Sequence, residues 1–433
     1  MYSPDETLLT GRVIRYRADP FLSPPAEAIE VEEAILLVGG LIAAIGEASA
    51  LAGAHPDARR VDYGDKIISA GFVDSHNHYP QTGIIASWGK RLIDWLNTYT
   101  FPEEMRFGEA DYAAEIAERY LDLLIANGIT SAAAFCTIHP ESVEALFTAA
   151  EARGMRMTAG KVMMDRNAPE GLRDTAQAGY DQSKALIGRW AGRGRLTYAV
   201  TPRFAPTSTP AQLEAAGALW AAHPDCAMQT HLSEQTEEIA WMKDLFPGDP
   251  DYLAVYERFG LCGPGAIMGH AIHLTDREIA AMRDTGAAVA HCPTSNAFIG
   301  SGMCDVTGLR AAGVPVGLAT DVGGGSSFSM LATMRSAYEI GQLRGDALHP
   351  AQLWWLATAG SATAMRQSDR IGALSPGMEA DLVILDPDAT PVLAQRTARA
   401  EDIGDVLFAL TILGDDRAIH QTWVNGKEMK GAT

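Results

Sequence analysis

Residues 71–78 read GFVDSHNH, a short apolar run that ends in two histidines, His76 and His78. Such a run predicts a buried β-strand. Similar runs recur from residue 70 onward and alternate with helical stretches such as Ala110–Ala126 and Glu141–Arg153. The other seven strand candidates are Gly128–Phe135, Met155–Met164, Leu196–Thr201, Cys226–His231, Ala266–His270, Ala287–His291 and Val316–Thr320. Eight strands that alternate with helices predict an α/β fold, a (β/α)8 barrel of the TIM type.

The two ends of the chain have a different pattern from the middle. Residues 33–45 contain two β-branched runs joined at Gly39 and Gly40, which is typical of a hairpin. Strand-like runs return after residue 371, with a turn signal at Asn425-Gly426. We expect the two ends to pair into one small β-sandwich domain beside the barrel. The predicted segments are 1–69 and 371–433 for the two parts of the sandwich, and 70–370 for the barrel.

Composition limits the classes of function. The chain has 433 residues and a formal net charge of -20, which argues against binding to nucleic acid or to an anionic membrane. Its first residues show no signal peptide, and no early apolar run is long enough for a transmembrane helix. The five cysteines form no CxxC pair, which excludes a zinc finger and predicts reduced thiols in a cytoplasmic protein.

His76 and His78 are the first candidate metal ligands. Residues i and i+2 of a strand face the same side, so both imidazoles can bind one ion. His231 and Asp321 each close another predicted strand, and such strand ends meet around one pocket in a barrel. Taken singly, each residue also fits a helix cap or a packed core histidine. Together they predict a mononuclear metal site, since imidazole nitrogen and carboxylate oxygen bind zinc and similar metals.

Glu234, His270 and Asp321 are the candidate catalytic residues. Glu234 follows the predicted strand end, where it can carry a proton from water to a substrate; it also fits a solvated carboxylate in an acidic run. A divalent metal lowers the pKa of bound water to about 7 in zinc enzymes, and Asp321 can accept the proton of that water. His270 closes its own strand, and we expect it to donate a hydrogen bond rather than to bind the metal.

Four more residues complete the set of candidates. His291 could orient Asp321 or line the pocket, or it could pack in the core. Glu237 and Glu238 are assigned to the surface. A binuclear site would need a bridging lysine, and Lys161 lies early in its strand rather than at its end. We therefore expect one metal.

The collected residues resemble the amidohydrolase superfamily over essentially the whole chain and, within it, the guanine deaminases. The motifs that carry the resemblance are His76-x-His78-x-x-Gln81, the segment 92–104 (LIDWLNTYTFPEE), Thr201–Phe204, His231–Glu234 and Thr320–Gly325. The resemblance implies one Zn2+ ion per chain and the hydrolysis of guanine to xanthine and ammonia. The residues that it implies for substrate binding are His78, Gln81, Arg203, Phe204, His231, Glu234, His270 and Asp321.

The chemistry of two of these residues suits a purine. Arg203 offers a rigid fork of donors for the six-oxo group and the ring nitrogens, and Gln81 offers both a donor and an acceptor. Two alternative functions stay open. One is an aminohydrolase of another oxidised purine, a pterin or a triazine; the other is a non-catalytic barrel scaffold, which would lack ligands. The sequence is compatible with a homodimer, and it decides neither the oligomeric state, nor the native metal, nor the loop that closes over the pocket.

Overall fold

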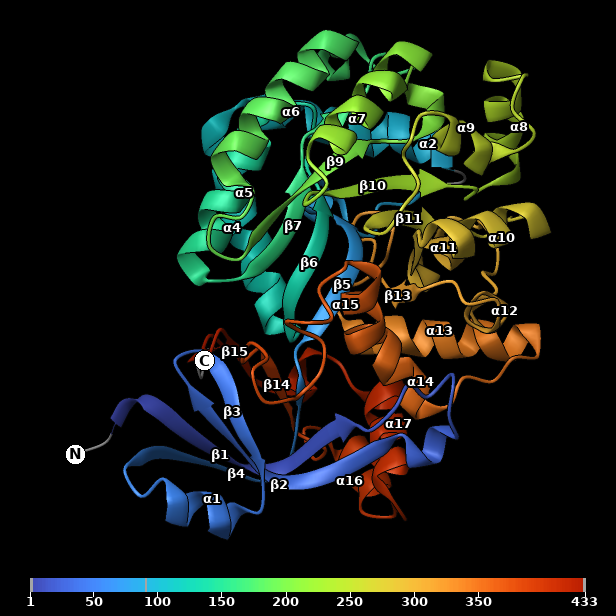
Figure 1. The fold of residues 1–433 in the computed structure, drawn as a ribbon. Helices are drawn as coiled ribbons and strands as arrows, with labels where there is room; N and C mark the ends of the chain where they lie inside the picture. Colours follow the sequence, from blue (N-terminus) through green and yellow to red (C-terminus); the bar gives the residue numbers. More distant parts are fainter. Residues whose placement is uncertain (1–2, 90–91, 431–433) are drawn as a thin grey trace.

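The computed structural model describes residues 3–89 and 92–430. The outermost residues of the two predicted sandwich segments, 1–2 and 431–433, lie outside the described residues. Figure 1 shows a barrel wrapped by helices and, beside it, a smaller sheet that contains strands from both chain ends. The predicted architecture of a parallel barrel with an added β-domain is confirmed.

The barrel strands follow one another in chain order from β5 to β13. They are β5 (Phe72–His78), β6 (Ile129–Phe135), β7 (Arg156–Gly160), β8 (Val162–Met163), β9 (Leu196–Pro202), β10 (Ala227–Leu232), β11 (Ala266–His270), β12 (Ala288–His291) and β13 (Val316–Leu318). Both β7 and β8 pair with β9, so they form one interrupted strand, and each of the eight predicted strands is present. The ring is nearly closed between its first and last strands, because Ser75 Oγ donates to the Leu318 carbonyl over 3.0 Å.

Helices cover the outside of the barrel (Figure 1). They are α4 (Ala110–Ala126), α5 (Pro140–Arg153), α6 (Ala176–Trp190), α7 (Pro210–Ala222), α8 (Thr236–Leu245), α9 (Tyr252–Arg258), α10 (Asp276–Thr285), α11 (Pro293–Phe298), α12 (Val306–Ala311), α13 (Met330–Arg344), α14 (Pro350–Trp355) and α15 (Ser361–Ala364). The spacing of apolar residues explains the packing of α4, since Ile116, Tyr120 and Leu124 all lie on its buried face. The helices predicted over 110–126 and 141–153 are confirmed.

A group of short helical turns connects β5 to α4 and forms one side of the pocket. They are η2 (Tyr79–Ile84), α2 (Leu92–Trp95), η3 (Leu96–Thr100), α3 (Phe101–Glu104) and η4 (Met105–Gly108). Short 3-10 turns also occur elsewhere, at η1 (Pro25–Glu27), η5 (Glu170–Leu172), η6 (Ala205–Thr207) and η8 (Asp416–Ala418), and a π-helical turn at η7 (Leu356–Gly360).

The β-domain is one connected sheet of seven strands in the described part of the chain, in the order β16-β15-β14-β4-β1-β2-β3. Its strands are β1 (Ser3–Tyr16), β2 (Ile29–Val38), β3 (Leu41–Gly46), β4 (Ala58–Ala70), β14 (Leu382–Leu385), β15 (Ile419–Val424) and β16 (Lys427–Glu428). The two chain ends meet where β4 pairs antiparallel with β14. The predicted hairpin lies between β2 and β3, with Gly39 and Gly40 at φ 57° and 84°, a conformation that glycine adopts without strain.

The chain ends also contain helices among the strands. The helices are α1 (Ala48–Ala54), α16 (Pro391–Thr397) and α17 (Ile403–Leu413). Only strands were expected after residue 371, because a short apolar run such as that of α17 has no periodicity that separates a buried helix from a strand. Helix α17 belongs to the C-terminal segment but packs against α13 and α14 of the barrel. The domain boundaries at 69/70 and 370/371 therefore stay a proposal.

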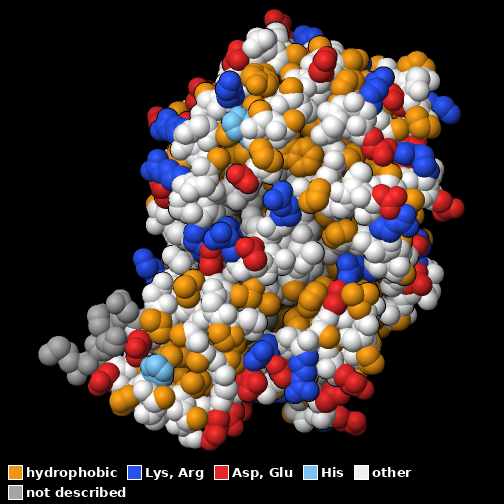
Figure 2. Space-filling view, viewed as in Figure 1, with side chains coloured by type: hydrophobic (Ala, Val, Ile, Leu, Met, Phe, Trp, Pro, Cys, Tyr) orange, Lys and Arg blue, Asp and Glu red, His pale blue; other side chains and the backbone are white. Residues whose placement is uncertain are grey.

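Surface charge and helix length bear on binding to nucleic acid and on membrane insertion. On the face seen in Figure 2, acidic and basic side chains are interspersed over the described residues rather than gathered into a single basic band. Among residues 3–89 and 92–430, none of the helices is long and apolar enough to cross a membrane.

Candidate active site

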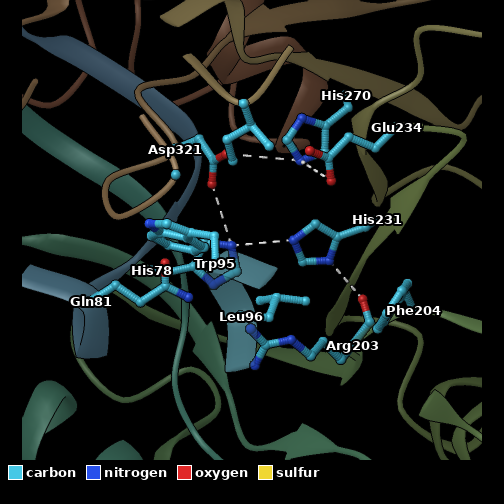
Figure 3. A pocket seen from close by; sticks show the side chains of 12 residues that line it. His78, Gln81, Trp95, Leu96, Arg203, Phe204, His231, Glu234, His270 and Asp321 are labelled. Carbon is cyan, nitrogen blue, oxygen red and sulfur yellow. Dashed lines mark hydrogen bonds and ion pairs between the residues drawn. The ribbon is translucent and has the colours of Figure 1, made fainter. Parts of the chain in front are cut away.

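A pocket of about 420 Å³ lies at the carboxyl end of the barrel strands (Figure 3). It is lined by His78, Gln81, Trp95, Leu96, Arg203, Phe204, His231, Glu234, His270, Ile299, Asp321 and Gly324. The structure thus brings together all eight residues to which substrate binding was assigned, from five different strand ends and the loops that follow them. Its mixture of buried apolar side chains and a few converging polar groups is typical of a site for a small organic molecule.

Four side chains from strand ends converge beneath this pocket, and we call them the strand-end cluster: His76, His78, His231 and Asp321. His231 Nε2 lies 3.2 Å from His78 Nε2. Asp321 Oδ1 lies 3.4 Å from His78 Nε2 and 3.5 Å from His76 Nε2. Zinc ligands lie about 2.0–2.2 Å from the metal, so neighbouring ligands of a tetrahedral site are about 3.4 Å apart. The spacing within the cluster therefore fits a divalent metal.

The protonation of the cluster leads to the same conclusion. His231 Nδ1 lies 2.7 Å from the Arg203 carbonyl, which can only accept, so its proton is on Nδ1 and a lone pair is on Nε2. Burial, followed by the neighbouring histidines, lowers the pKa of His231 and His78 well below its usual value. Neither ring nitrogen of the buried His76 has a hydrogen-bond partner among the described residues. Neutral imidazoles that face one another without donors are the ligand set that a metal cation stabilises.

His270 packs against the strand-end cluster, with its ring centroid 5.5 Å from that of His76 and 5.5 Å from that of His231. Its Nε2 is 3.5 Å from Glu234 Oε2 and 3.8 Å from Asp321 Oδ2, while its Nδ1 is 2.9 Å from Asn296 Oδ1. A second group with metal-binding spacing contains His76, His270, Cys292 and Asp321. Burial raises the pKa of Cys292 to about 11, and its Sγ donates to the Ala290 carbonyl over 3.3 Å, so Cys292 is a protonated thiol.

Glu234 is a buried carboxylic acid whose two oxygens have different surroundings. Ser301 Oγ donates to Oε1 over 3.0 Å, and Oε2 is the oxygen that faces His270. Burial raises the pKa of Glu234 above its usual value. A carboxyl group with a raised pKa exchanges protons more readily near neutral pH than an exposed one does. No sequence pattern indicated a role for Ser301, which lies 67 residues from Glu234 in the chain.

The assignment of Glu238 to the surface was wrong. Its side chain is buried, and Oε2 accepts from the backbone N–H groups of Glu234 over 2.9 Å and Gln235 over 3.2 Å. Tyr252 Oη donates to Oε1 over 2.7 Å. Glu238 is the third residue of α8 and forms a capping box with Gln235, so the spacing Gln-x-x-Glu was the signal for this contact. Glu237 is exposed, as expected.

A buried carboxylate joins the two residues proposed to bind the purine edge. Glu104 Oε1 accepts from Gln81 Nε2 over 3.0 Å, and Glu104 Oε2 accepts from Arg203 Nη1 over 2.6 Å. We call Gln81, Glu104 and Arg203 the Glu104 bridge. The three residues come from η2, from α3 and from the end of β9. The sequence motifs included Glu104 without giving it a role, because nothing local shows which carboxylate of a segment will be buried.

Apolar side chains form the remaining walls of the pocket. Trp95, Leu96, Phe204 and Ile299 all line it and are all buried. The segment 92–104 therefore contributes both apolar wall residues and the carboxylate of the Glu104 bridge; the side chains of its first two residues lie outside the described part. Flat apolar walls of this kind suit an aromatic ring.

Two other candidates lie away from the pocket lining. His291 is buried, and burial followed by the nearby His270 lowers its pKa to about 3. This position favours the packing interpretation over a role at the metal. Lys161 forms an ion pair with Asp174 and donates to the Val162 carbonyl, so its amine is committed elsewhere.

Comparisons with known proteins agree with this geometry. Residues 67–429 match the model of the amidohydrolase family. The chain is 46% identical to the guanine deaminase of Escherichia coli (strain K12) over 373 residues, which are 86% of this chain and 85% of that protein. It is 39% identical over 419 residues to a probable guanine deaminase of Deinococcus radiodurans, with 94% and 95% of the two chains covered. The solved structure of E. coli guanine deaminase matches with a TM-score of 0.96 and 42% identity, covering 99% of this chain and 100% of that one. The chain therefore belongs to the amidohydrolase family, together with the guanine deaminases.

Proposed function

We propose that this protein hydrolyses guanine to xanthine and ammonia, and that one zinc ion per chain is bound by His76, His78, His231 and Asp321. The observation that carries the proposal is that a single pocket joins a metal-binding cluster and a buried acid to the paired side chains of Gln81 and Arg203. The similarity to guanine deaminases over most of the chain supports the choice of substrate.

Zinc at this cluster would lower the pKa of water in the pocket toward neutrality and so make it a nucleophile at physiological pH. Imidazole-rich ligand sets suit zinc, and the donor set of three nitrogens and one oxygen agrees with that choice. We assign the four ligands to the strand-end cluster because its imidazole and carboxylate atoms have the spacing of a tetrahedral site, with 3.2 Å between His231 and His78 and 3.4 and 3.5 Å from Asp321 to His78 and His76.

The remaining steps are carried out by the side chains of the pocket. Glu234 accepts a proton from the attacking water and delivers it to N3 of the ring, while the water oxygen bonds to C2. Glu234 then passes the second proton of that water to the amino group, and the C2–N bond breaks to release ammonia. His270 and Asp321 hold the water: His270 donates to its oxygen and Asp321 accepts from it.

The base is oriented by polar and apolar contacts. Arg203 and Gln81 bind the edge that carries N1 and the six-oxo group, and Phe204 and Trp95 contact the ring. This places C2 toward the strand-end cluster and N3 toward Glu234, because those ring atoms follow N1 in order. The scaffold alternative predicted missing ligands, whereas His78, His231, Asp321 and Glu234 line one pocket and His76 lies within metal-binding distance of His78 and His231.

A small molecule is the partner that the lining of the pocket supports, because polar side chains converge there between apolar walls. We also propose a cytoplasmic location, because all five cysteines are free thiols and four of them are buried, as in proteins of a reducing compartment.

Ammonia release from guanine, measured for the wild type and for Glu234→Gln, tests this function. We expect the wild type to form xanthine and ammonia, and the variant to keep its metal while kcat falls by about 10²–10⁴-fold. Glu237→Gln changes an exposed carboxylate of the same acidic run and should keep wild-type activity. Turnover of another aminopurine, a pterin or a triazine in the absence of any turnover of guanine would contradict the proposal.

A further inference from the structure

We propose that Glu104 is a positioning residue that sets the order of hydrogen-bond donor and acceptor along the purine edge of the pocket. It turns the carbonyl of Gln81 toward the substrate and leaves Arg203 as the donor beside it. The site would therefore select bases with an N–H next to a ring C=O, and reject bases with a ring nitrogen acceptor next to an amino group. This inference rests on the proposed function.

The orientation of Gln81 follows from the chemistry of its partner. Glu104 is only 1% exposed, and its pairing with the Arg203 guanidinium at 2.6 Å marks it as an ionised carboxylate. A carboxylate has no hydrogen to donate, so the Gln81 atom 3.0 Å from Oε1 must be the amide nitrogen. The carbonyl oxygen Oε1 of Gln81 is then turned away from Glu104, toward the loop after Asp321 at the wall of the pocket that Gln81 lines.

Gly323 provides the space that this orientation needs. A Cβ at Gly323 would lie 1.9 Å from Gln81 Oε1, and the glycine has a φ of 111°, which side chains rarely adopt. The carbonyl of Gln81 therefore lies in space that only glycine leaves open. Both ends of the Gln81 amide are thus fixed by neighbours, the nitrogen by Glu104 and the oxygen by the shape of the loop after Asp321.

Arg203 is fixed by the same carboxylate. Its Nη1 is bound to Glu104, and its Cζ lies 5.7 Å from the centroid of the Phe101 ring, so α3 contacts the guanidinium through two residues. The other guanidinium N–H groups stay available and can only donate. Figure 3 shows Gln81 and Arg203 in the lower part of the pocket and Glu234 beside His270 in its upper part. The Glu104 bridge and Glu234 would therefore contact different edges of a bound purine ring.

The resulting pattern matches a lactam edge. Gln81 accepts from an N1–H group, and Arg203 donates to the neighbouring six-oxo oxygen. A six-amino base offers an acceptor at N1 and a donor at C6, which opposes the site at both positions. A mismatch of this kind in a buried site leaves polar groups of the protein unpaired, which is why hydrogen-bonding sites reject such analogues strongly.

Glu104→Gln tests the inference by reversing this pattern. Arg203 only donates, so the new amide must turn its oxygen to Arg203 and its NH2 group to Gln81. Gln81 must then turn its own oxygen to that group and its NH2 toward the substrate. We expect kcat/KM for guanine to fall by about 100-fold, mainly through KM, since Glu104 does not touch the reacting carbon.

The informative comparison is with 2-aminopurine, which carries the same leaving group but has an acceptor at N1 and no six-oxo group. Its kcat/KM should not fall in Glu104→Gln and should rise, because the Gln81 NH2 group can now donate to N1. The preference for guanine over 2-aminopurine should therefore narrow by about 100-fold or more. Glu103→Gln is the matched control, because Glu103 is the adjacent carboxylate of α3 and pairs with Arg106 instead. The preference of Glu103→Gln for guanine over 2-aminopurine should equal that of the wild type.

A binding measurement separates this inference from catalysis. Hypoxanthine has the lactam edge without an amino group at C2, and purine lacks both. Calorimetry should show that Glu104→Gln weakens the binding of hypoxanthine by about 10-fold or more and the binding of purine by less than about 3-fold. If Glu104→Gln does not fold, Gln81→Met removes the Gln81 acceptor together with the N–H group that donates to Glu104. It should narrow the preference for guanine over 2-aminopurine and for hypoxanthine over purine.

Equal losses for guanine and 2-aminopurine, or no loss for either, would overturn the inference and leave Glu104 as a merely structural residue. A wild type that releases no ammonia from guanine would instead overturn the proposed function. In that case the relative binding of hypoxanthine and purine would still report the polarity of the pocket edge.

Discussion

The strand-end cluster and the Glu104 bridge lie in one pocket but are built in different ways. The three cluster histidines sit at the ends of β5 and β10, where the strand ladder holds the backbone. Asp321 lies three residues beyond β13, and its backbone N–H donates to the His76 carbonyl over 3.0 Å. The members of the bridge come from positions 81, 104 and 203 and hold one another through side chains alone. This difference suggests that the cluster determines whether the reaction occurs, and that the bridge determines which base enters it.

Backbone conformation adds to the contrast. Four non-glycine residues at or just after the ends of β10, β11 and β13 have positive φ angles: Ser233 at 48°, His270 at 67°, Ala271 at 47° and Asp321 at 49°. Such angles are costly for side chains and concentrate at functional sites, where surrounding structure enforces them. They turn the chain immediately at the strand ends, so the catalytic side chains project into the pocket. No residue of the bridge has a positive φ among the described residues.

Metal removal should have the largest effect, and it should act on every substrate alike. After dialysis against a chelator, we expect ammonia release from guanine and from 2-aminopurine to fall together, by about 10⁴-fold or more. Added Zn2+ should restore both, in the wild type and in Glu104→Gln. Metal analysis checks that bound metal is lost on dialysis and regained on addition of Zn2+. Full activity of the metal-free protein would contradict the assignment of catalysis to the strand-end cluster and of base preference to the Glu104 bridge.

Arg203→Lys should have an intermediate effect that is confined to substrate binding. Lysine keeps the charge but loses the rigid fork that pairs with Glu104 and the base together. We expect KM for guanine to rise by about 10–100-fold with the metal retained. Arg106→Lys changes an arginine that pairs with the neighbouring Glu103 and serves as the control. A loss of bound metal in Arg203→Lys would show that the bridge and the cluster are not separable.

Replacement of Glu238 should have the smallest effect, and it should change the pH dependence of stability rather than the preference between bases. Burial, followed by the charge of Glu234, raises the pKa of Glu238 from 4.5 to about 7, so between these pH values the folded protein binds a proton that the unfolded chain releases. The free energy of unfolding should therefore decrease as pH rises from 4.5 to 7, by on the order of 3 kcal/mol for this group. Urea unfolding at pH 5 and pH 7.5 should show a smaller decrease in Glu238→Gln.

Glu237→Gln is the control for that measurement, since it alters the exposed neighbour. It should keep the decrease seen in the wild type. An unchanged pH dependence in Glu238→Gln would mean that the Glu238 carboxylate is not the group that titrates.

Sequence patterns predicted the parts of the site that depend on local structure. His76 and His78 lie on one strand, and His231 and Asp321 each follow an apolar run, so their convergence followed from the barrel topology. The location of Glu238 was predicted wrongly, although the Gln-x-x-Glu spacing of its capping box was present in the sequence. Helix α17 was missed because its apolar run carries no distinguishing period.

By itself, the sequence determined the barrel, the added β-domain and the strand-end positions of the metal ligands, because hydrophobic periodicity and strand ends are local properties of the chain. Only the tertiary structure decided that Glu104 is buried between Gln81 and Arg203, and that Ser301 holds Glu234. Gln81 and Glu104 are 23 positions apart in the chain, and Glu104 and Arg203 are 99 positions apart. Glu234 and Ser301 are 67 positions apart. The physical reason is that burial of a charged side chain depends on partners brought by other elements, and no pattern within a single segment records them.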